Sequence, residues 1–426
     1  MKSRYVIIGG SAGGIGAVEE IRRYDKNGTI VLVSEEPYEP YSRPMISDYL
    51  AGEATFEKMQ FRPTYFWGSY KAKPLLGRRV TNINFDEKYL KIQESKKLFF
   101  EKLLLAVGGK PFIPNMEGIK KVGIYTFSNL SDSQLLKDRI NEINKVVVIG
   151  GGLIGISVTE AFAKLNKKVS IIELKDRILN LIVDDTTSHI IEGVMKKNGV
   201  RIITNNSVKQ IKGKKQNKEK IDHVVLTDGQ KIECDTVVIA IGVVPRTELV
   251  DSGNIRINKG ILVDRYMSTN NPDVYACGDV SEAYDYIIGE NRVLALWPLA
   301  YQGGRIAGSN MVGLKNKYQG GTIMSALKYF NVPAISVGIS NPDNRDNEYE
   351  ILSSIDKDEI NYKKIVLKNG AICGLTLVGD IEKAGIYFNL IKEKIKLQKY
   401  KNNLLSPEFG LSHLPKSYSM KLIRRN

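Results

Sequence analysis

The chain has 426 residues, of which 42% are hydrophobic and 26% are charged, and its formal net charge is +15. This length predicts two to four domains of about 100–200 residues each, and the composition has neither a disordered nor a membrane signature. The longest apolar runs, such as residues 103–107 and 237–241, fall far short of the roughly 20 residues that a transmembrane helix needs, so no membrane span is expected.

Cysteines and histidines are few and isolated. Cys234, Cys277 and Cys373 form no CxxC or CxxxxC pair, and the three histidines stand far apart. This spacing argues against a disulfide framework, an internal redox disulfide and a metal site. Met1 is followed closely by an apolar strand at residues 5–8, without the apolar leader and cleavage site of a secretory signal, so a cytoplasmic location is expected.

Residues 4–35 read as a strand, a glycine loop, a helix at residues 17–24, a second strand at residues 29–34, and an acid. A glycine loop in this place lets a pyrophosphate approach the backbone and meet the N terminus of the helix. Ser11 stands where the middle glycine of a GxGxxG motif is expected, and its small side chain still permits that approach. The predicted nucleotide contacts are Gly9, Gly10, Ser11, Ala12, Gly13, Gly14 and, for the ribose, Glu35.

Residues 145–173 repeat this order with a complete GxGxxG motif. The motif follows the apolar strand at residues 146–149 and precedes a helix that runs through Glu160. Glu173 lies 23 residues after Gly150, where a carboxylate binds the 2′-hydroxyl of a ribose. This favours NAD over NADP, although Lys175 leaves room for a 2′-phosphate. The predicted contacts are Gly150, Gly152, Leu153, Ile154, Gly155 and Glu173.

The second unit is nested inside the first. Its closing strand lies near residues 237–241, and a further strand at residues 273–279 is expected to return to the first unit. Alternating strands and helices of this kind predict an α/β fold with parallel, doubly wound sheets. From about residue 320 the pattern changes to short strands, at residues 334–337, 364–367 and 371–378, and a long helix beginning near Ile381, so a terminal α+β domain is expected.

Four stretches resemble the two-dinucleotide-fold flavoproteins of the pyridine nucleotide-disulfide oxidoreductase superfamily. They are PYSRPMIS at residues 40–47, AVGGKP at 106–111, VYACGD at 274–279, and LVGD at 377–380 with Ala384 and Gly385. The resemblance is strongest to the branch of rubredoxin reductases, ferredoxin reductases and the flavin region of NADH-dependent nitrite reductases, and it covers nearly the whole chain. It implies FAD and NAD(H) as cofactors, with NADP(H) also possible.

The resemblance also implies a domain order and further site residues. Two nested Rossmann-like three-layer domains are expected, for FAD at residues 1–112 and 244–318 and for NAD(P) at 113–243, followed by an α+β interface domain with a basic tail at 319–426. Glu35 and the first turn hold the adenosine half of FAD, and the second turn, with Glu160 and Glu173, holds NAD(H). The remaining implied contacts are Arg43 and Pro44 beside the flavin, Asp279 at the ribityl chain, and Ala106, Gly108, Leu299 and Gly242. Asp48 stands where several electron-transfer members carry lysine.

The absence of a cysteine from residues 1–233 selects a branch of this family. The oxidases, peroxidases and coenzyme A disulfide reductases that resemble this chain in fold use a single cysteine near the loop that Ser42, Arg43 and Pro44 occupy here. Cys277 is expected to be buried and unreactive. We therefore expect hydride transfer from NADH to flavin across the interface of the nucleotide domains, with no catalytic side chain, and onward transfer of electrons to a rubredoxin, ferredoxin or other iron–sulfur protein.

Two alternatives remain open at this point. One is a thiol-independent NADH oxidase that reduces oxygen or a small disulfide, and the other is an NADH-sensing flavoprotein that regulates a partner. From residue 392 to the end, nine Lys and Arg residues stand against two Glu. This charge favours a lysine-rich helix and tail exposed to solvent over a nucleic-acid site. The alternative is a docking surface for an acidic electron-carrier protein. The terminal domain also makes a homodimer possible.

Overall fold

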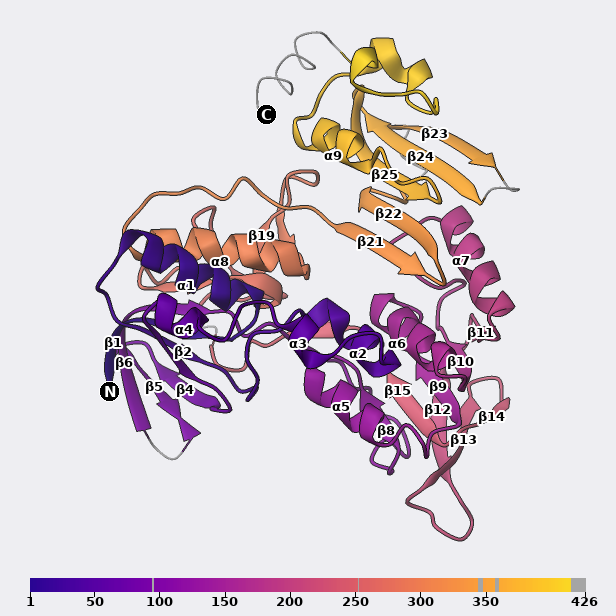
Figure 1. Ribbon diagram of the computed structural model, residues 1–426, viewed down its shortest axis with the longest axis horizontal. Coiled ribbons are helices and arrows are strands. Elements are labelled where there is room, and N and C mark those ends of the chain that lie inside the picture. The colour runs from indigo at the N-terminus through magenta and orange to yellow at the C-terminus, as the bar shows by residue number, and fades with distance from the viewer. Residues whose placement is uncertain (94–95, 252, 344–347, 357–359, 415–426) are drawn as a thin grey trace. The chain divides into compact units, whose positions relative to one another are not determined.

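A computed structural model describes residues 1–93, 96–251, 253–343, 348–356 and 360–414 (Figure 1). The chain forms two compact units, each built from three stretches. Unit 1 contains Met1–Pro114, Tyr125–Glu142 and Ile241–Gly321, and unit 2 contains Asn115–Ile124, Ile143–Ala240 and Thr322–Asn426. Because the second stretch of unit 2, Ile143–Ala240, interrupts unit 1 in sequence, the nested order that the sequence predicts is present.

The main sheet of unit 1 is largely parallel. Its strand order is β3-β2-β1-β6-β5-β4, with β18 beside β6. Strands β3, β2, β1, β6 and β18 run parallel, whereas β5 and β4 are antiparallel additions. The expected return of the chain at residues 273–279 is confirmed, because β18 pairs with the end of β6. The strands are β1 (Lys2–Ile8), β2 (Ile30–Val33), β3 (Ala72–Leu75), β4 (Val80–Asn84), β5 (Tyr89–Ile92), β6 (Lys96–Leu105) and β18 (Val274–Ala276).

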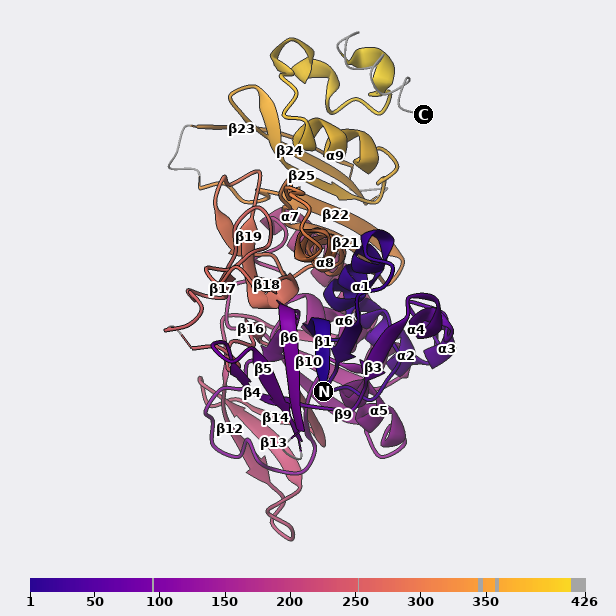
Figure 2. The same cartoon turned by 90° about the vertical axis from the view of Figure 1, so that its left-hand side faces the viewer.

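Two long helices of unit 1, α1 (Ala12–Tyr24) and α8 (Trp297–Met311), lie side by side in both views (Figures 1 and 2). Glycines allow this approach: a Cβ on Gly304 would lie 1.9 Å from the carbonyl oxygen of Gly13. The other elements of the unit are shorter: η1 (Arg43–Met45), α2 (Ile46–Ala51), α3 (Phe56–Met59), α4 (Phe66–Ser69), β7 (Gly109–Pro111), α5 (Leu130–Asp138), β16 (Val243–Pro245), β17 (Ile261–Leu262), η3 (Gly278–Val280), β19 (Ser281–Tyr284) and β20 (Asn291–Val293). Strand β8 (Ile124–Thr126) spans the boundary between the units.

The nested part of unit 2 has its own parallel sheet, in the order β11-β10-β9-β15. Apolar residues fill these strands, as is typical of a parallel sheet whose faces are covered. The elements are β9 (Lys145–Ile149), α6 (Leu153–Lys164), β10 (Lys168–Ile172), α7 (Asp185–Lys197), β11 (Arg201–Ile203), β15 (Thr236–Ile239) and an antiparallel ribbon of β12 (Val208–Gly213), β13 (Ile221–Leu226) and β14 (Lys231–Glu233).

The C-terminal part of unit 2 is an antiparallel sheet in the order β21-β22-β25-β24-β23. Its strands are β21 (Met324–Tyr329), β22 (Val332–Gly338), β23 (Tyr349–Asp356), β24 (Asn361–Lys368) and β25 (Ala371–Val378), and α9 (Ala384–Lys392) packs against β25. The α/β class and the three expected strands are confirmed. The expected long helix is wrong, because α9 has nine residues and Lys394 then adopts a φ of 50°, which turns the chain so that Leu397 is buried. Much of the basic tail, residues 415–426, lies outside the described residues.

Within the described part of the chain, no helix is long and apolar enough to cross a bilayer. The same residues contain no group of three or more His, Cys, Asp or Glu side chains that could hold a metal ion.

Candidate dinucleotide-binding sites

The first glycine turn joins β1 to α1. Gly9 has a φ of 118°, which L side chains rarely adopt, and a Cβ there would lie 2.1 Å from the oxygen of Ala106. A Cβ on Gly14 would lie 1.9 Å from the oxygen of Gly9. Only glycine fits these two positions, so the turn brings the N terminus of α1 directly over the end of β1. Ser11 is the N-cap with a φ of −92°, which explains why a serine is accepted where the motif expects glycine.

The second turn has the same design. Gly150 has a φ of 105°, and a Cβ on Gly155 would lie 1.9 Å from the oxygen of Gly150. Gly152 is the N-cap of α6, and a Cβ added there would meet no atom within 4 Å. Leu153 and Ile154 open the helix. The turn is therefore closely packed on its protein side and open at the N terminus of α6.

Both helices start in a way that suits an anionic ligand. No side chain caps either N terminus within the described residues, and neither α1 nor α6 carries an acid in its first turn. The backbone N–H groups and the positive end of each helix dipole are thus left for a ligand rather than neutralised by the protein. These features, together with the open space at Gly152, fit the pyrophosphate of a dinucleotide.

Glu173 lies at the end of β10 and is 8% exposed. One of its carboxylate oxygens accepts a hydrogen bond from the N–H of Gly151 at 2.6 Å, and the other accepts one from the N–H of Lys175 at 2.8 Å. These bonds fix a carboxylate beside the glycine turn. A negative charge held there disfavours a 2′-phosphate and leaves acceptor capacity for a ribose hydroxyl.

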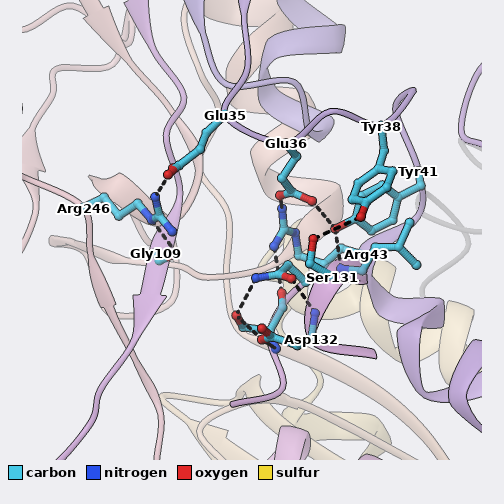
Figure 3. A network of polar contacts seen from close by, with 12 residues as sticks. Glu35, Glu36, Tyr38, Tyr41, Arg43, Gly109, Ser131, Asp132 and Arg246 are labelled. Carbon is cyan, nitrogen blue, oxygen red and sulfur yellow. Dashed lines mark hydrogen bonds and ion pairs between the residues drawn. The ribbon is translucent and has the colours of Figure 1, made fainter. Parts of the chain in front are cut away.

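Glu35, the corresponding acid after β2, has a different environment. Its side chain is 47% exposed and lies between Arg246 Nη1 at 2.9 Å and Arg79 Nη1 at 3.5 Å. Arg246 also donates its backbone N–H to the oxygen of Gly108 and its side-chain Nε–H to the oxygen of Gly109 (Figure 3). The ion pairs hold Glu35 against the loop that follows β6, near the first turn.

Arg43 is the centre of a second polar network in unit 1 (Figure 3). Its guanidinium pairs with Glu36 and donates to the carbonyl oxygen of Ser128 at 2.7 Å. Tyr41 donates to the other oxygen of Glu36 at 2.5 Å and accepts from the N–H of Leu130 at 2.9 Å. Burial opposes the charge on Arg43, but Glu36 outweighs it and raises the pKa of the guanidinium. Arg43 therefore stays protonated and is paired with the carboxylate of Glu36, and Pro44 follows in η1.

Asp279 lies in η3, directly after β18. Burial raises the pKa of this carboxyl above its ordinary value, although the charge of Arg43 opposes the rise. Cys277, two residues earlier, is 1% exposed, and burial raises the pKa of its thiol to about 12. The thiol is consequently neutral near pH 7 and is packed against Gly13 of the first turn, as expected for a structural cysteine.

The remaining predicted residues fall into two groups. Ala106, Gly108 and Gly242 lie at the ends of β6 and β15, and Gly108 and Gly242 have positive φ and open space where a Cβ would stand. Leu299 lies in the first turn of α8. The carboxylate of Glu160, in contrast, is bonded within unit 2. It accepts a hydrogen bond from the N–H of Phe330 at 2.9 Å and lies 3.3 Å from Lys164 Nζ.

Sequence reasoning missed the residues that support these sites. Glu36 and Arg246 act only through spatial neighbours, and nothing in their local pattern marks them. Tyr41 lies inside the PYSRP motif and could have been found there. Leu179 was also missed: its N–H donates to the oxygen of Gly151 at 2.8 Å, from a backbone φ of 53°.

The chain matches two family models. Residues 3–304 match the model described as Pyridine nucleotide-disulphide oxidoreductase, which is more than half of the chain. The chain belongs to the pyridine nucleotide-disulphide oxidoreductase family. Residues 324–395 match a model described as Rubredoxin NAD+ reductase C-terminal domain, so this member carries that terminal domain as well.

Relatives in this family are moderately similar. The chain is 27% identical over 410 residues to the assimilatory nitrate reductase electron transfer subunit of Bacillus subtilis, covering 96% of this chain and 51% of that protein. It is 32% identical over 288 residues to the 5,5'-dehydrodivanillate O-demethylase ferredoxin reductase subunit of Sphingobium sp., covering 67% and 69%. The chain thus spans about half the length of the first of these relatives.

A solved structure shows the same fold. The covalent putidaredoxin reductase–putidaredoxin complex matches with a TM-score of 0.86 at 22% identity, over 100% of this chain and 99% of that chain. Proteins of this family use FAD and NAD(P)H, and the family member described here has two dinucleotide turns, which is the number that these two cofactors require.

Proposed function

We propose that this chain is an FAD-dependent NADH:acceptor oxidoreductase that reduces a small electron-carrier protein of the rubredoxin or ferredoxin type. The proposal rests on the family to which the chain belongs, taken together with the positions and the burial of its cysteines. The family's two dinucleotide turns are intact, yet residues 1–233 contain no cysteine, and Cys277 is buried and neutral. Residues 1–233 and Cys277 thus offer no redox-active disulfide or oxidised cysteine that electrons from NADH could reduce, so an external acceptor is needed.

The two cofactors are assigned by their surroundings. The first turn, with Glu35, Arg43 and Asp279, would hold FAD, and the permanent charge on Arg43 would stabilise electron-rich groups beside it. The second turn, with Glu173, would hold NADH in preference to NADPH. When bound, FAD accepts a hydride and releases electrons one at a time, while the protein orients both ligands. The division into residues 1–112, 113–243, 244–318 and 319–426 is part of this proposal.

The identity of the acceptor is supported by the C-terminal match and by the named relatives. A terminal domain of the rubredoxin reductase type and a ferredoxin reductase relative both favour a small iron–sulfur or rubredoxin partner. The net charge of +15 favours an acidic one, because opposite charges accelerate encounter. A cytoplasmic location and a homodimer stay predictions.

Anaerobic titration with NADH tests the proposal directly. The purified protein is expected to show a flavin spectrum that one equivalent of NADH bleaches, and a subsequent addition of oxidised ferredoxin or rubredoxin is expected to restore it. The rate of the second step should fall as salt is raised, because salt screens the attraction between the partners.

Two results would contradict this function. Properly folded protein without flavin would remove the basis for both turns. Peroxide release that matches NADH consumption in air, with no gain from any carrier protein, would identify an oxidase instead.

A further inference from the structure

A short segment of unit 2, residues 178–184, connects the second glycine turn to the C-terminal sheet. At one end, Leu179 donates its N–H to the oxygen of Gly151, and the side chain of Ile178 packs against the same glycine, where a Cβ would lie 2.8 Å from Ile178 Cγ2. Leu179 holds a φ of 53° to do so. A leucine keeps this backbone conformation only when its surroundings enforce it.

The other end of the segment is held by the C-terminal sheet. The hydroxyls of Ser336 and Ser340 both donate to the carbonyl oxygen of Ile182, at 2.7 Å and 3.1 Å. The amide of Asn341 donates to the oxygen of Val183 at 2.8 Å. Three side chains around β22 therefore satisfy two consecutive carbonyl groups of the segment in a half-buried place.

Asp184 closes the segment and starts α7. One carboxylate oxygen accepts from the N–H of Thr187, which caps the helix, and the other accepts from Tyr362 at 2.6 Å and lies 3.2 Å from Lys364 Nζ. Asp184 is 4% exposed and Lys364 is 9% exposed. Although burial alone raises the pKa of Asp184, Tyr362 and Lys364 hold it below its ordinary value. Helix α7 lies beside the β21–β22 end of the sheet in Figures 1 and 2.

We infer that the C-terminal sheet positions the second glycine turn through residues 178–184. Ser336, Ser340 and Tyr362 are then positioning residues for nicotinamide-dinucleotide binding. The inference rests on the proposed function. None of these side chains touches the turn itself; they fix Ile182 and Asp184, and the strained Leu179 then holds Gly151. The terminal sheet therefore contributes to affinity for the dinucleotide as well as to its own core.

Two variants test this inference in the FAD-containing protein. Ser336→Ala with Ser340→Ala removes both donors to Ile182, and Tyr362→Phe removes one donor to Asp184 without changing shape. Each is expected to raise the Kd for NAD+, measured by titration calorimetry, and the KM for NADH by about fivefold, since a net hydrogen bond is worth about 1 kcal/mol. The kcat for a one-electron carrier and the flavin content should stay within twofold. Amide exchange at Leu179 should become faster.

Thr376→Val is the matched control. Thr376 pairs with Ser336 across the sheet and is 0% exposed, but its hydroxyl has no hydrogen-bond partner among the described residues. Asp184→Asn is a third test variant that keeps the cap of α7, because asparagine caps as well as aspartate. We expect Thr376→Val to leave the Kd for NAD+ unchanged and Asp184→Asn to raise it.

The outcomes separate this inference from the proposed function. Wild-type protein that binds neither NAD+ nor NADH would refute the proposed function itself. Wild-type binding with an unchanged Kd and unchanged Leu179 exchange in the variants would overturn the positioning role alone, even if the variants melted at a lower temperature. A raised Kd in all three test variants with a normal Thr376→Val control would support it.

Discussion

Glycines in the two dinucleotide turns serve different physical purposes. Gly9 and Gly150 supply a positive φ, and Gly14 and Gly155 allow helix and turn to meet, with hypothetical Cβ contacts of 1.9 Å. Gly152 does neither, because its φ is −80° and nothing lies within 4 Å of a Cβ there. Its value is the empty space beside the N terminus of α6. A methyl group in that space would not meet the protein, and it would meet the dinucleotide that is proposed to bind there.

Gly152→Ala is therefore expected to weaken binding of NAD+ at least about tenfold while changing the free energy of unfolding by no more than about 1 kcal/mol, the scale of an N-cap substitution. Gly155→Ala should do the opposite and destabilise the fold by about 1–3 kcal/mol through overpacking. Calorimetric titration and denaturant unfolding distinguish the two. Equal losses of stability in both variants would show that Gly152 is needed for folding.

Much of the site could be predicted from the sequence at this scale. The glycines and Glu173 belong to a contiguous strand, loop and helix pattern, so local spacing was enough to place them beside one another. Arg246 and Leu179 could not be placed, because each meets its partner only through the folded sheet. Glu160 lies in α6 as the sequence predicts. The sequence does not predict, however, that its carboxylate accepts a hydrogen bond from the N–H of Phe330.

The close packing of α1 on α8 is the feature of unit 1 that carries the first turn. Three glycines, Gly13, Gly304 and Gly308, remove side chains from the contact, and a Cβ on Gly308 would lie 2.7 Å from the oxygen of Ala17. Since α1 begins at the turn, any displacement of α8 moves the N–H groups that face the predicted FAD pyrophosphate. We therefore expect helix packing and retention of the predicted FAD to be linked.

Gly304→Ala is expected to lower the free energy of unfolding by about 1–3 kcal/mol and to lower the ratio of bound FAD to protein after purification. Gly193→Ala in α7 is the control, since a Cβ there meets nothing within 4 Å, and alanine should raise stability by about 0.5–1 kcal/mol in a helix interior. Flavin absorbance and unfolding curves provide both measurements. Full flavin content in Gly304→Ala would show that the helix contact does not support the turn.

Helices and strands are predicted best where a single sequence pattern distinguishes one from the other. The parallel strands are short apolar runs and were recognised as such, whereas α9 was expected to be longer because the lysine-rich stretch after Lys392 is compatible with a helix. Tertiary structure ends it instead, since Leu397 donates its N–H to the oxygen of Gly370 and is buried. Propensity alone is a weak guide when one buried leucine can redirect the chain.

Buried proton donors are distributed over both units. Burial raises the pKa to about 12 for Cys277 and Tyr286 in unit 1 and for Cys234 and Tyr329 in unit 2, from ordinary values of 9.0 for cysteine and 10.0 for tyrosine. The unfolded chain releases these protons at a lower pH than the folded chain does. The stability that the neutral groups contribute is complete below pH 9 and is lost as pH rises toward 12.

The free energy of unfolding is thus expected to fall above about pH 9, by up to about 1.4 kcal/mol per pH unit for each group that ionises only in the unfolded state. Denaturant unfolding at a series of pH values checks this. Replacing Cys277 with alanine should make the decline shallower, because one of the groups is removed. A stability that stays constant to about pH 11 would contradict the burial of these groups.

The return of β18 to β6 also sets an order of events during synthesis. Residues 274–276 pair with residues 103–105, so the nested part of unit 2 emerges from the ribosome between the two partners. At about 5–20 residues per second, the end of β6 waits roughly 10–30 s for its neighbour. Leu103, Leu104 and Leu105, at most 1% exposed in the finished fold, have an open edge during that time. The inner domain has time to fold first, and a nascent chain arrested before residue 274 would present this edge to chaperones.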